Sequence, residues 1–149
     1  MRSLTVLYDA RCGFCSTCRH WLEGQAQLVR LEFLPAGSPT ARRRFPTLVD
    51  SARGEELVVV SDEGGVYRGP QALIVCLWAL EDYRDWSFRL ARPSLLPVAR
   101  DIFEWVSVHR GGLSWLLRMR SDEEVAAAIG ARRPCATDRC AAPKAEGGR

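Results

Sequence analysis

The chain is almost without lysine, and its basic residues do not gather into a stripe. Lys144 is the only lysine among 21 Lys and Arg residues, and the net charge is only +3. Arg42-Arg43-Arg44 is the only run of three basic residues. A nucleic-acid site would need a longer basic stripe or aromatic stacking platforms. We therefore expect no nucleic-acid partner and interpret the triplet as a solvated patch.

Long hydrophobic segments are also missing. A membrane-spanning helix needs ~20 apolar residues, and the longest apolar run, 72–80, is about half that length. The first three residues lead directly into a strand pattern, without the apolar segment of an export signal. We therefore expect no membrane span and a cytoplasmic location, where a reducing environment leaves cysteines available for chemistry rather than for structural disulfides.

The length and composition are those of one globular domain. The chain has 149 residues, of which 47% are hydrophobic and 26% charged. Residues 131–149 are rich in Ala, Pro and Gly and lack periodicity. The sequence thus predicts one domain over residues 1–130 and a flexible C-terminal tail over residues 131–149.

The order of hydrophobic patterns predicts an α/β fold. Alternating or β-branched runs predict strands over 4–8, 28–34, 56–61 and from 66. Helical patterns cover 13–23, part of 40–50, 71–83, 96–108, 113–120 and 125–129, the last opened by a capping box at 121–124. We expect Gly24 to end the first helix in a left-handed conformation. The order resembles a thioredoxin-like central mixed sheet with flanking helices and additional C-terminal helices.

Two cysteines stand where the first predicted strand gives way to the first helix. Cys12 and Cys15 are three residues apart, and Cys12 lies at the helix boundary. Unpaired N–H groups and the macrodipole at a helix N-terminus stabilise a thiolate. Arg11 is expected to add cationic stabilisation. We therefore expect Cys12 to attack a disulfide and Cys15 to resolve the mixed disulfide.

Geometry favours Cys12–Cys15 as the bridging pair. Residues three apart inside a helix keep their Cβ atoms about 5–6 Å apart, whereas a disulfide needs about 3.5–4.5 Å. Cys15 and Cys18 both lie within the predicted helix, while Cys12 at its boundary can adopt another conformation. Cys18 is left as a third thiol. No bound cofactor is required, because the dithiol itself carries two electrons.

Asp9 precedes Cys12 by three residues and has two possible roles. Its carboxylate can cap helix N–H groups and fix the loop, or it can accept a proton when Cys15 attacks. The two roles conflict electrically, because a nearby anion raises the pKa of a thiol. Both alternatives remain open from the sequence, and Tyr8 before it is interpreted as a packing residue.

Two other classes of function compete with the enzyme. In the first, Cys12, Cys15 and Cys18 bind a metal or carry electrons, with Cys135 or Cys140 as the fourth ligand. The local spacing fails the ferredoxin pattern, and we favour Cys18 as a small buried residue facing the sheet. In the second, the motif is vestigial and the chain is an interaction domain.

The remaining singled-out side chains have ordinary structural interpretations. His20 and His109 are expected at the surface or in packing, and Cys76 in the core. Trp105 and Trp115 are expected mainly in the core, although together they could mark a docking face. The sequence does not indicate an oligomeric state.

With Asp9, Cys12 and Cys15 in the pattern D-x-x-C-x-x-C, the chain resembles the DCC family of thiol–disulfide oxidoreductases. Val58-Val59-Val60, the Gly64-Gly65 turn and the 106–110 stretch ahead of two glycines are similar to later parts of that family. The resemblance covers roughly residues 4–120. It implies a thioredoxin-like fold, exchange through Cys12 and Cys15, and protein or small-molecule thiols and disulfides as substrates.

Overall fold

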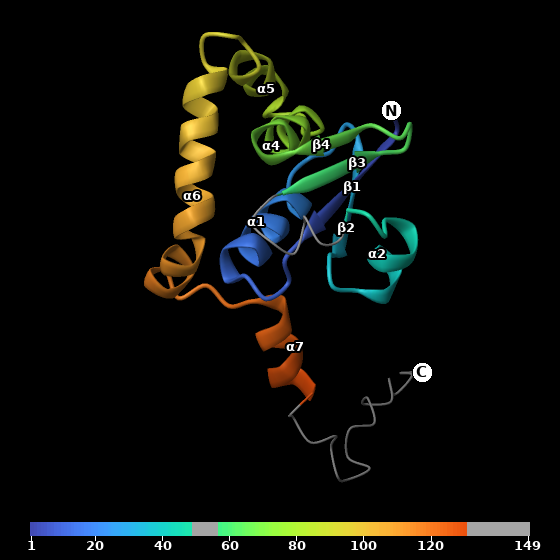
Figure 1. Ribbon diagram of the computed structural model, residues 1–149, viewed down its shortest axis with the longest axis vertical. Coiled ribbons are helices and arrows are strands. Elements are labelled where there is room, and N and C mark those ends of the chain that lie inside the picture. The colour runs from blue at the N-terminus through green and yellow to red at the C-terminus, as the bar shows by residue number, and fades with distance from the viewer. Residues whose placement is uncertain (49–56, 131–149) are drawn as a thin grey trace, which may run out of the picture.

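The computed structural model describes residues 1–48 and 57–130 and shows a four-stranded sheet with helices on both faces (Figure 1). The strands are β1 (Ser3–Tyr8), β2 (Arg30–Pro35), β3 (Val58–Ser61) and β4 (Val66–Arg68). The described helices are α1 (Gly13–Glu23), α2 (Pro39–Arg44), α4 (Gly69–Trp78), α5 (Arg84–Leu90), α6 (Leu96–Leu116) and α7 (Asp122–Gly130). This is the predicted α/β architecture.

The sheet has the strand order β2-β1-β3-β4 and is mixed. β1 pairs in parallel with β2, and α1 is the crossover between them. β3 is antiparallel to β1 and to β4, so β3 and β4 form the predicted hairpin. Val6 lies at the centre of the sheet, opposite Phe33 on one side and Val59 on the other. This mixed sheet with flanking helices is a thioredoxin-like fold.

Alternation along the central strands divides the core between the two faces of the sheet. Leu4, Val6 and Val59 face one cluster, which includes residues of α1 and α4. Leu7 and Val58 belong to the other cluster, on the side of α2. Successive strand residues point to opposite faces of the sheet, so the apolar residues on each face pack against a different set of helices.

The long helix α6 forms an outer layer. In Figure 1 it stands at the left edge, with α1 and α4 between it and the strands, while α2 lies on the opposite side. Within the described residues 1–48 and 57–130, no helix combines the length and apolar character needed to cross a membrane.

The start of α7 is tied back to the end of β1 and to α1. The Tyr8 hydroxyl donates to Asp122 Oδ2 at 2.8 Å, and the Asp122 N–H donates to Ser16 Oγ at 3.0 Å. The predicted capping box is present, since Ser121 N donates to Glu124 Oε2 and Glu124 N donates to Ser121 Oγ. The bonds of Asp122 hold the start of α7 against the end of β1 and the N-terminal half of α1.

The helices differ from the sequence prediction in several places. α6 is one continuous helix over the two stretches predicted separately, and α5 was not predicted. Gly24 ends α1 with φ −77°, in the right-handed region, so the predicted left-handed cap is wrong. α2 ends at Arg44, before Pro46, in agreement with the short helix predicted within 40–50, of which residues 49 and 50 lie outside those described. Cys76 is fully buried, as predicted.

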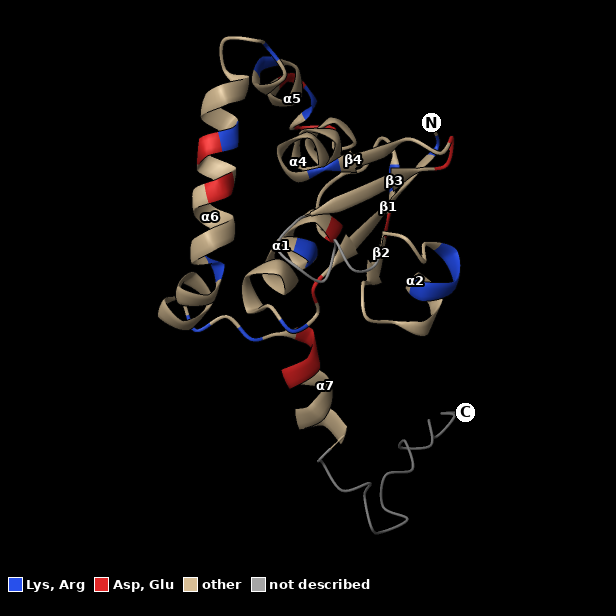
Figure 2. Cartoon of the chain, in the orientation of Figure 1, with Lys and Arg blue, Asp and Glu red and all other residues tan. Residues whose placement is uncertain are grey.

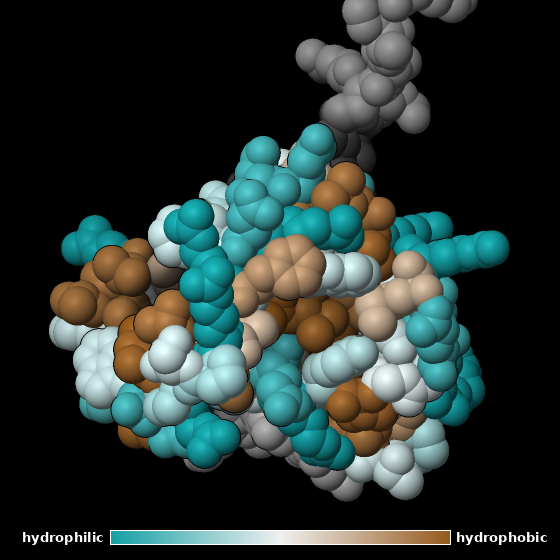
Figure 3. All heavy atoms as spheres, turned by 90° about the horizontal axis from the view of Figure 1, so that it is seen from above, coloured by the Kyte–Doolittle hydropathy of each residue, from teal (hydrophilic) through white to brown (hydrophobic). Residues whose placement is uncertain are grey.

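The tryptophans of α6 lie at the surface, which contradicts their prediction as core residues. Trp105 is 57% exposed and Trp115 is 83% exposed. Figure 3 shows hydrophobic residues on the surface at the left of that view, the side on which α6 stands in Figure 1, and α6 also exposes Val98, Ile102 and Val108. Trp105 stacks on His109 of the same helix, with ring centroids 4.7 Å apart. A helix in the outermost layer has too little protein on its far side to bury them.

The basic triplet lies on α2, at the side of the sheet away from α6 (Figure 2). Arg44 Nη1 donates to Glu32 Oε1 of β2 at 2.7 Å, and both side chains are exposed. The triplet is therefore a solvated patch with a partly paired charge, as its short length indicates.

Candidate active site

Cys12 is the N-cap of α1. Its backbone is extended, with φ −90° and ψ 115°, and its Sγ accepts a hydrogen bond from Cys15 N at 3.3 Å. Its carbonyl accepts from Ser16 N at 3.0 Å, the first bond of the helix. A serine or aspartate oxygen usually fills this capping role. Here a sulfur does so, and the helix N-terminus favours its anionic form.

The surroundings of Cys12 stabilise its thiolate. A hydrogen bond from the Cys15 thiol is the largest of the effects that lower the pKa of Cys12 to about 6. Partial burial opposes the shift, while the N–H of Cys15 and the positive charge of Arg110 support it. Because that pKa lies below neutrality, Cys12 is largely a thiolate at pH 7.

Cys15 and Cys18 have the opposite environment. The pKa of Cys15 is raised, first because its thiol donates to Cys12, then by burial and by the charge of Cys12. Partial loss of hydration, followed by the charge of Cys12, also raises the pKa of Cys18. The described cysteines are free thiols, so the structure shows the reduced pair. Cys12 is thus the nucleophile, and Cys15 stays protonated until Cys12 loses its negative charge.

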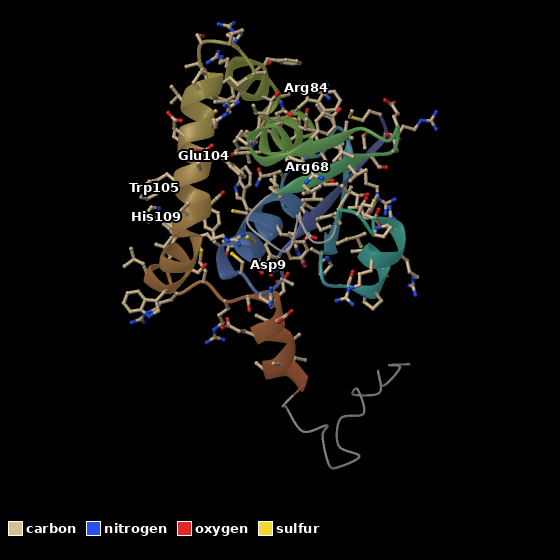
Figure 4. All side chains as sticks on the ribbon, in the orientation of Figure 1. Asp9, Arg68, Arg84, Glu104, Trp105 and His109 are labelled. Carbon is tan, nitrogen blue, oxygen red and sulfur yellow. The ribbon has the colours of Figure 1, made fainter. Side chains whose placement is uncertain are left out.

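Asp9 fixes the loop that carries Cys12. Its Oδ1 accepts from Arg11 N at 3.0 Å and from Arg11 Nε at 3.5 Å, and its carbonyl accepts from Cys12 N at 3.2 Å. Figure 4 labels Asp9 beside the N-terminal end of α1. These are the bonds of loop fixation. The helix itself is capped by Cys12, so the capping part of the prediction for Asp9 is wrong.

Arg110, from α6, is the cation that lowers the pKa of Cys12, and the sequence did not predict this role. Arg11 was expected to stabilise Cys12, but its guanidinium lies against Asp9, and it is Arg110 whose charge lowers the pKa of Cys12. Ser114, one turn further along α6, accepts from Phe14 N through its Oγ at 2.9 Å. The only sequence signal for these residues was the basic end of the 106–110 stretch.

The two sulfurs open onto different spaces. Cys12 lines a groove of about 880 Å³ that also contains Arg11, Arg110 and residues of the segment after α6. Cys15 lines a cavity of about 370 Å³ between α1, the sheet and α6, with mainly apolar walls. Asp9 and Arg110 line both spaces. A molecule can therefore approach the pair from a polar side and from an apolar side.

The chain matches a known protein family over most of its length. The model of the DCC1-like thiol-disulfide oxidoreductases matches residues 6–116, which include the end of β1, the cysteine pair and Arg110. The chain belongs to this family. No curated protein and no solved structure gives a significant match to the chain.

Within this DCC1-like chain, Cys18 does not take the place predicted for it. It is exposed, and it lines the cavity beside Cys15 and the residues of α6 rather than packing on the sheet. The prediction failed because the third thiol, one turn after Cys15, points to the side of α1 that faces the outer layer.

The alternative metal site finds no support in the described part of the chain. No three His, Cys, Asp or Glu side chains are grouped there so as to hold a metal ion. His20 Nε2 lies 3.2 Å from Asp122 Oδ1 and is exposed, as a surface residue. Cys135 and Cys140, which the alternative invoked as fourth ligands, lie outside the described residues.

Proposed function

We propose that this DCC1-like protein reduces disulfides of protein or small-molecule substrates through a Cys12–Cys15 dithiol. The observation that carries the proposal is the N-cap position of Cys12, whose Sγ accepts from Cys15 N at 3.3 Å, and the Cys15 thiol further lowers the pKa of Cys12. Both donors favour the thiolate, the species that attacks a disulfide.

The reaction proceeds in two exchange steps. The Cys12 thiolate attacks one substrate sulfur, forms a mixed disulfide and expels the other sulfur as a thiolate, which takes a proton from solvent. Loss of the negative charge on Cys12 removes two of the effects that raise the pKa of Cys15. Cys15 then deprotonates, attacks Cys12 Sγ and releases the second substrate thiol. The net result is one substrate disulfide reduced and one Cys12–Cys15 disulfide formed.

In this proposal Asp9 is a positioning residue. It holds Arg11 and the backbone of the loop, so that Cys12 enters the helix with an extended backbone. An external thiol of a reducing, cytoplasmic environment regenerates the dithiol. The clustering of three cysteines in the first 18 residues supports such a setting, because structural disulfides use dispersed cysteines.

The test separates the roles of the two sulfurs. In single-turnover reactions of the reduced protein with a disulfide, Cys12→Ser is expected to abolish exchange, and Cys15→Ser to accumulate a mixed disulfide on Cys12. Mass spectrometry of the quenched protein identifies the adduct. Cys18→Ser is the matched control on the same helix and should retain both steps. Full exchange by the Cys12→Ser protein would overturn the proposal.

A further inference from the structure

A cavity with mainly apolar walls lies beside Cys15, and the mechanism leaves it unused. Its volume of about 370 Å³ lies within the range of small-molecule pockets. Its walls come from α1, α6, the sheet and the α4 region, and include Phe14, Phe33, Leu73 and Phe103. Such walls bind an apolar group by removing it from water.

The charged residues that line this cavity already have opposite charges beside them. Arg19 donates to Glu23 Oε2 at 3.0 Å and to Asp122 Oδ2 at 3.3 Å. The carboxylate of Asp9 lies against Arg11, and Arg110 acts on the Cys12 thiolate. A charged ligand would compete with these interactions, so the cavity fits an uncharged group.

The position of the cavity relative to the two sulfurs identifies which part of a substrate enters it. Cys12 faces the groove, Cys15 faces the cavity, and Asp9 and Arg110 line both. A disulfide attacked by Cys12 therefore lies where the two spaces adjoin. The group attached to its sulfur can extend past Cys15 between α1 and α6.

We propose that the physiological substrates are low-molecular-weight disulfides with an uncharged apolar group next to sulfur, and that this group binds in the Cys15 cavity. The inference rests on the proposed function and adds the substrate class. Cys12 attacks the sulfur, and the apolar thiol leaves after Cys15 closes the protein disulfide. Per turnover one dithiol is oxidised and one disulfide yields two thiols.

A matched pair of disulfides tests the substrate class. Dipropyl disulfide and bis(2-hydroxyethyl) disulfide differ only by a methyl group in place of each hydroxyl. Each single-turnover rate with the reduced full-length protein is divided by the rate with free dithiothreitol, because the leaving thiols differ in pKa. We expect this ratio to favour dipropyl disulfide by at least about tenfold, since the walls are mainly apolar and a hydroxyl that enters them gives up its hydration.

Filling the cavity tests the place of binding. Ser107, on α6, lines the cavity, whereas Val108 beside it is 74% exposed. Ser107→Phe is expected to remove the preference for dipropyl disulfide, because it lowers the rate with the substrate whose apolar group needs the cavity more than the rate with the hydroxyl compound. Val108→Phe is the control for added bulk on the same helix and should keep the preference.

The outcomes distinguish the two proposals. If neither disulfide reacts, the proposed function fails; if both react with equal ratios, only the substrate class is overturned. Equal loss of both rates in Ser107→Phe, with circular dichroism unchanged, would also overturn the cavity assignment. If the preference for dipropyl disulfide disappeared as the protein concentration rose, a second copy of the chain would cover the cavity. That result would also overturn the cavity assignment.

Discussion

The arginine that matters for Cys12 is far from it in sequence. Arg11 is the neighbour along the chain, yet Asp9 lies beside its guanidinium, and the charge that lowers the pKa of Cys12 comes from Arg110. The thiol of Cys15 contributes more than either arginine. The reactivity of the pair therefore depends mainly on a local hydrogen bond and secondarily on the docking of α6.

Replacement of Arg110 tests this ranking. Arg110→Gln is expected to raise the pKa of Cys12 by about one pH unit or less, because one nearby cation is lost while the hydrogen bonds from Cys15 remain. Thiolate absorbance as a function of pH measures it in the reduced protein. Arg11→Gln is the control and should leave the pKa nearly unchanged. A larger shift in Arg11→Gln than in Arg110→Gln would contradict the assignment.

For individual residues, the sequence predicted those contacts that follow from short spacing along the chain. Cys12 and Cys15 are three residues apart at a strand-to-helix junction, so their contact follows from the chain between them. Arg110 and Ser114 reach the same junction from about a hundred residues away. No local pattern encodes that approach, because it depends on how α6 packs over α1.

Among the elements, the chain after α6 passes so close to the start of α1 that it limits which residue can stand at position 13. A Cβ at Gly13 would lie 2.4 Å from the carbonyl oxygen of Met119, which is closer than real Cβ contacts. The glycine between Cys12 and Phe14 is therefore required by a segment from the other end of the fold. Its conformational freedom is secondary.

Gly13→Ala is expected to destabilise the protein. In an ordinary helix this change would stabilise by up to about 1 kcal/mol, but the clash with backbone at Met119 reverses the sign, and overpacking costs about 1–3 kcal/mol. Urea unfolding of the reduced protein measures the difference.

Gly112 provides the matched control for that change. It lies within α6, and a Cβ added there meets no atom within 4 Å. Gly112→Ala should therefore keep or raise the free energy of unfolding. If Gly13→Ala stabilised the protein as much as Gly112→Ala, the close crossing would not exist in solution.

Strands and helices were predicted with unequal success for a physical reason. The strands and their hairpin follow from short apolar runs and glycine turns, which are local signals. α6 was predicted as two helices on either side of Gly111 and Gly112, yet it continues through both glycines, although each weakens a helix by about 1 kcal/mol. Its contacts with α1 and α4 are tertiary, and tertiary packing overrides propensity.

Over the whole molecule, the thiolate links the active site to folding. The native fold lowers the pKa of Cys12 to about 6, whereas an unfolded thiol has a pKa of about 8.5. A group with a depressed pKa binds fewer protons in the native state, so its stabilising contribution is complete above the unfolded pKa. That contribution is lost as the pH falls through the native pKa.

The free energy of unfolding of the reduced protein should therefore exceed that of Cys12→Ser by more at about pH 8 than at about pH 5. The other titrating groups are the same in both proteins, and the two that Cys12 acts on, Cys15 and Cys18, stay mainly protonated over this range, so the difference reports chiefly on Cys12. The raised pKa values of Cys15 and Cys18 act at higher pH and stay outside this window. Urea titrations under reductant measure the difference, and the same comparison with Cys18→Ser should be flat. A flat profile for Cys12→Ser would mean that the fold does not stabilise the thiolate, and catalysis through it would lose its physical basis.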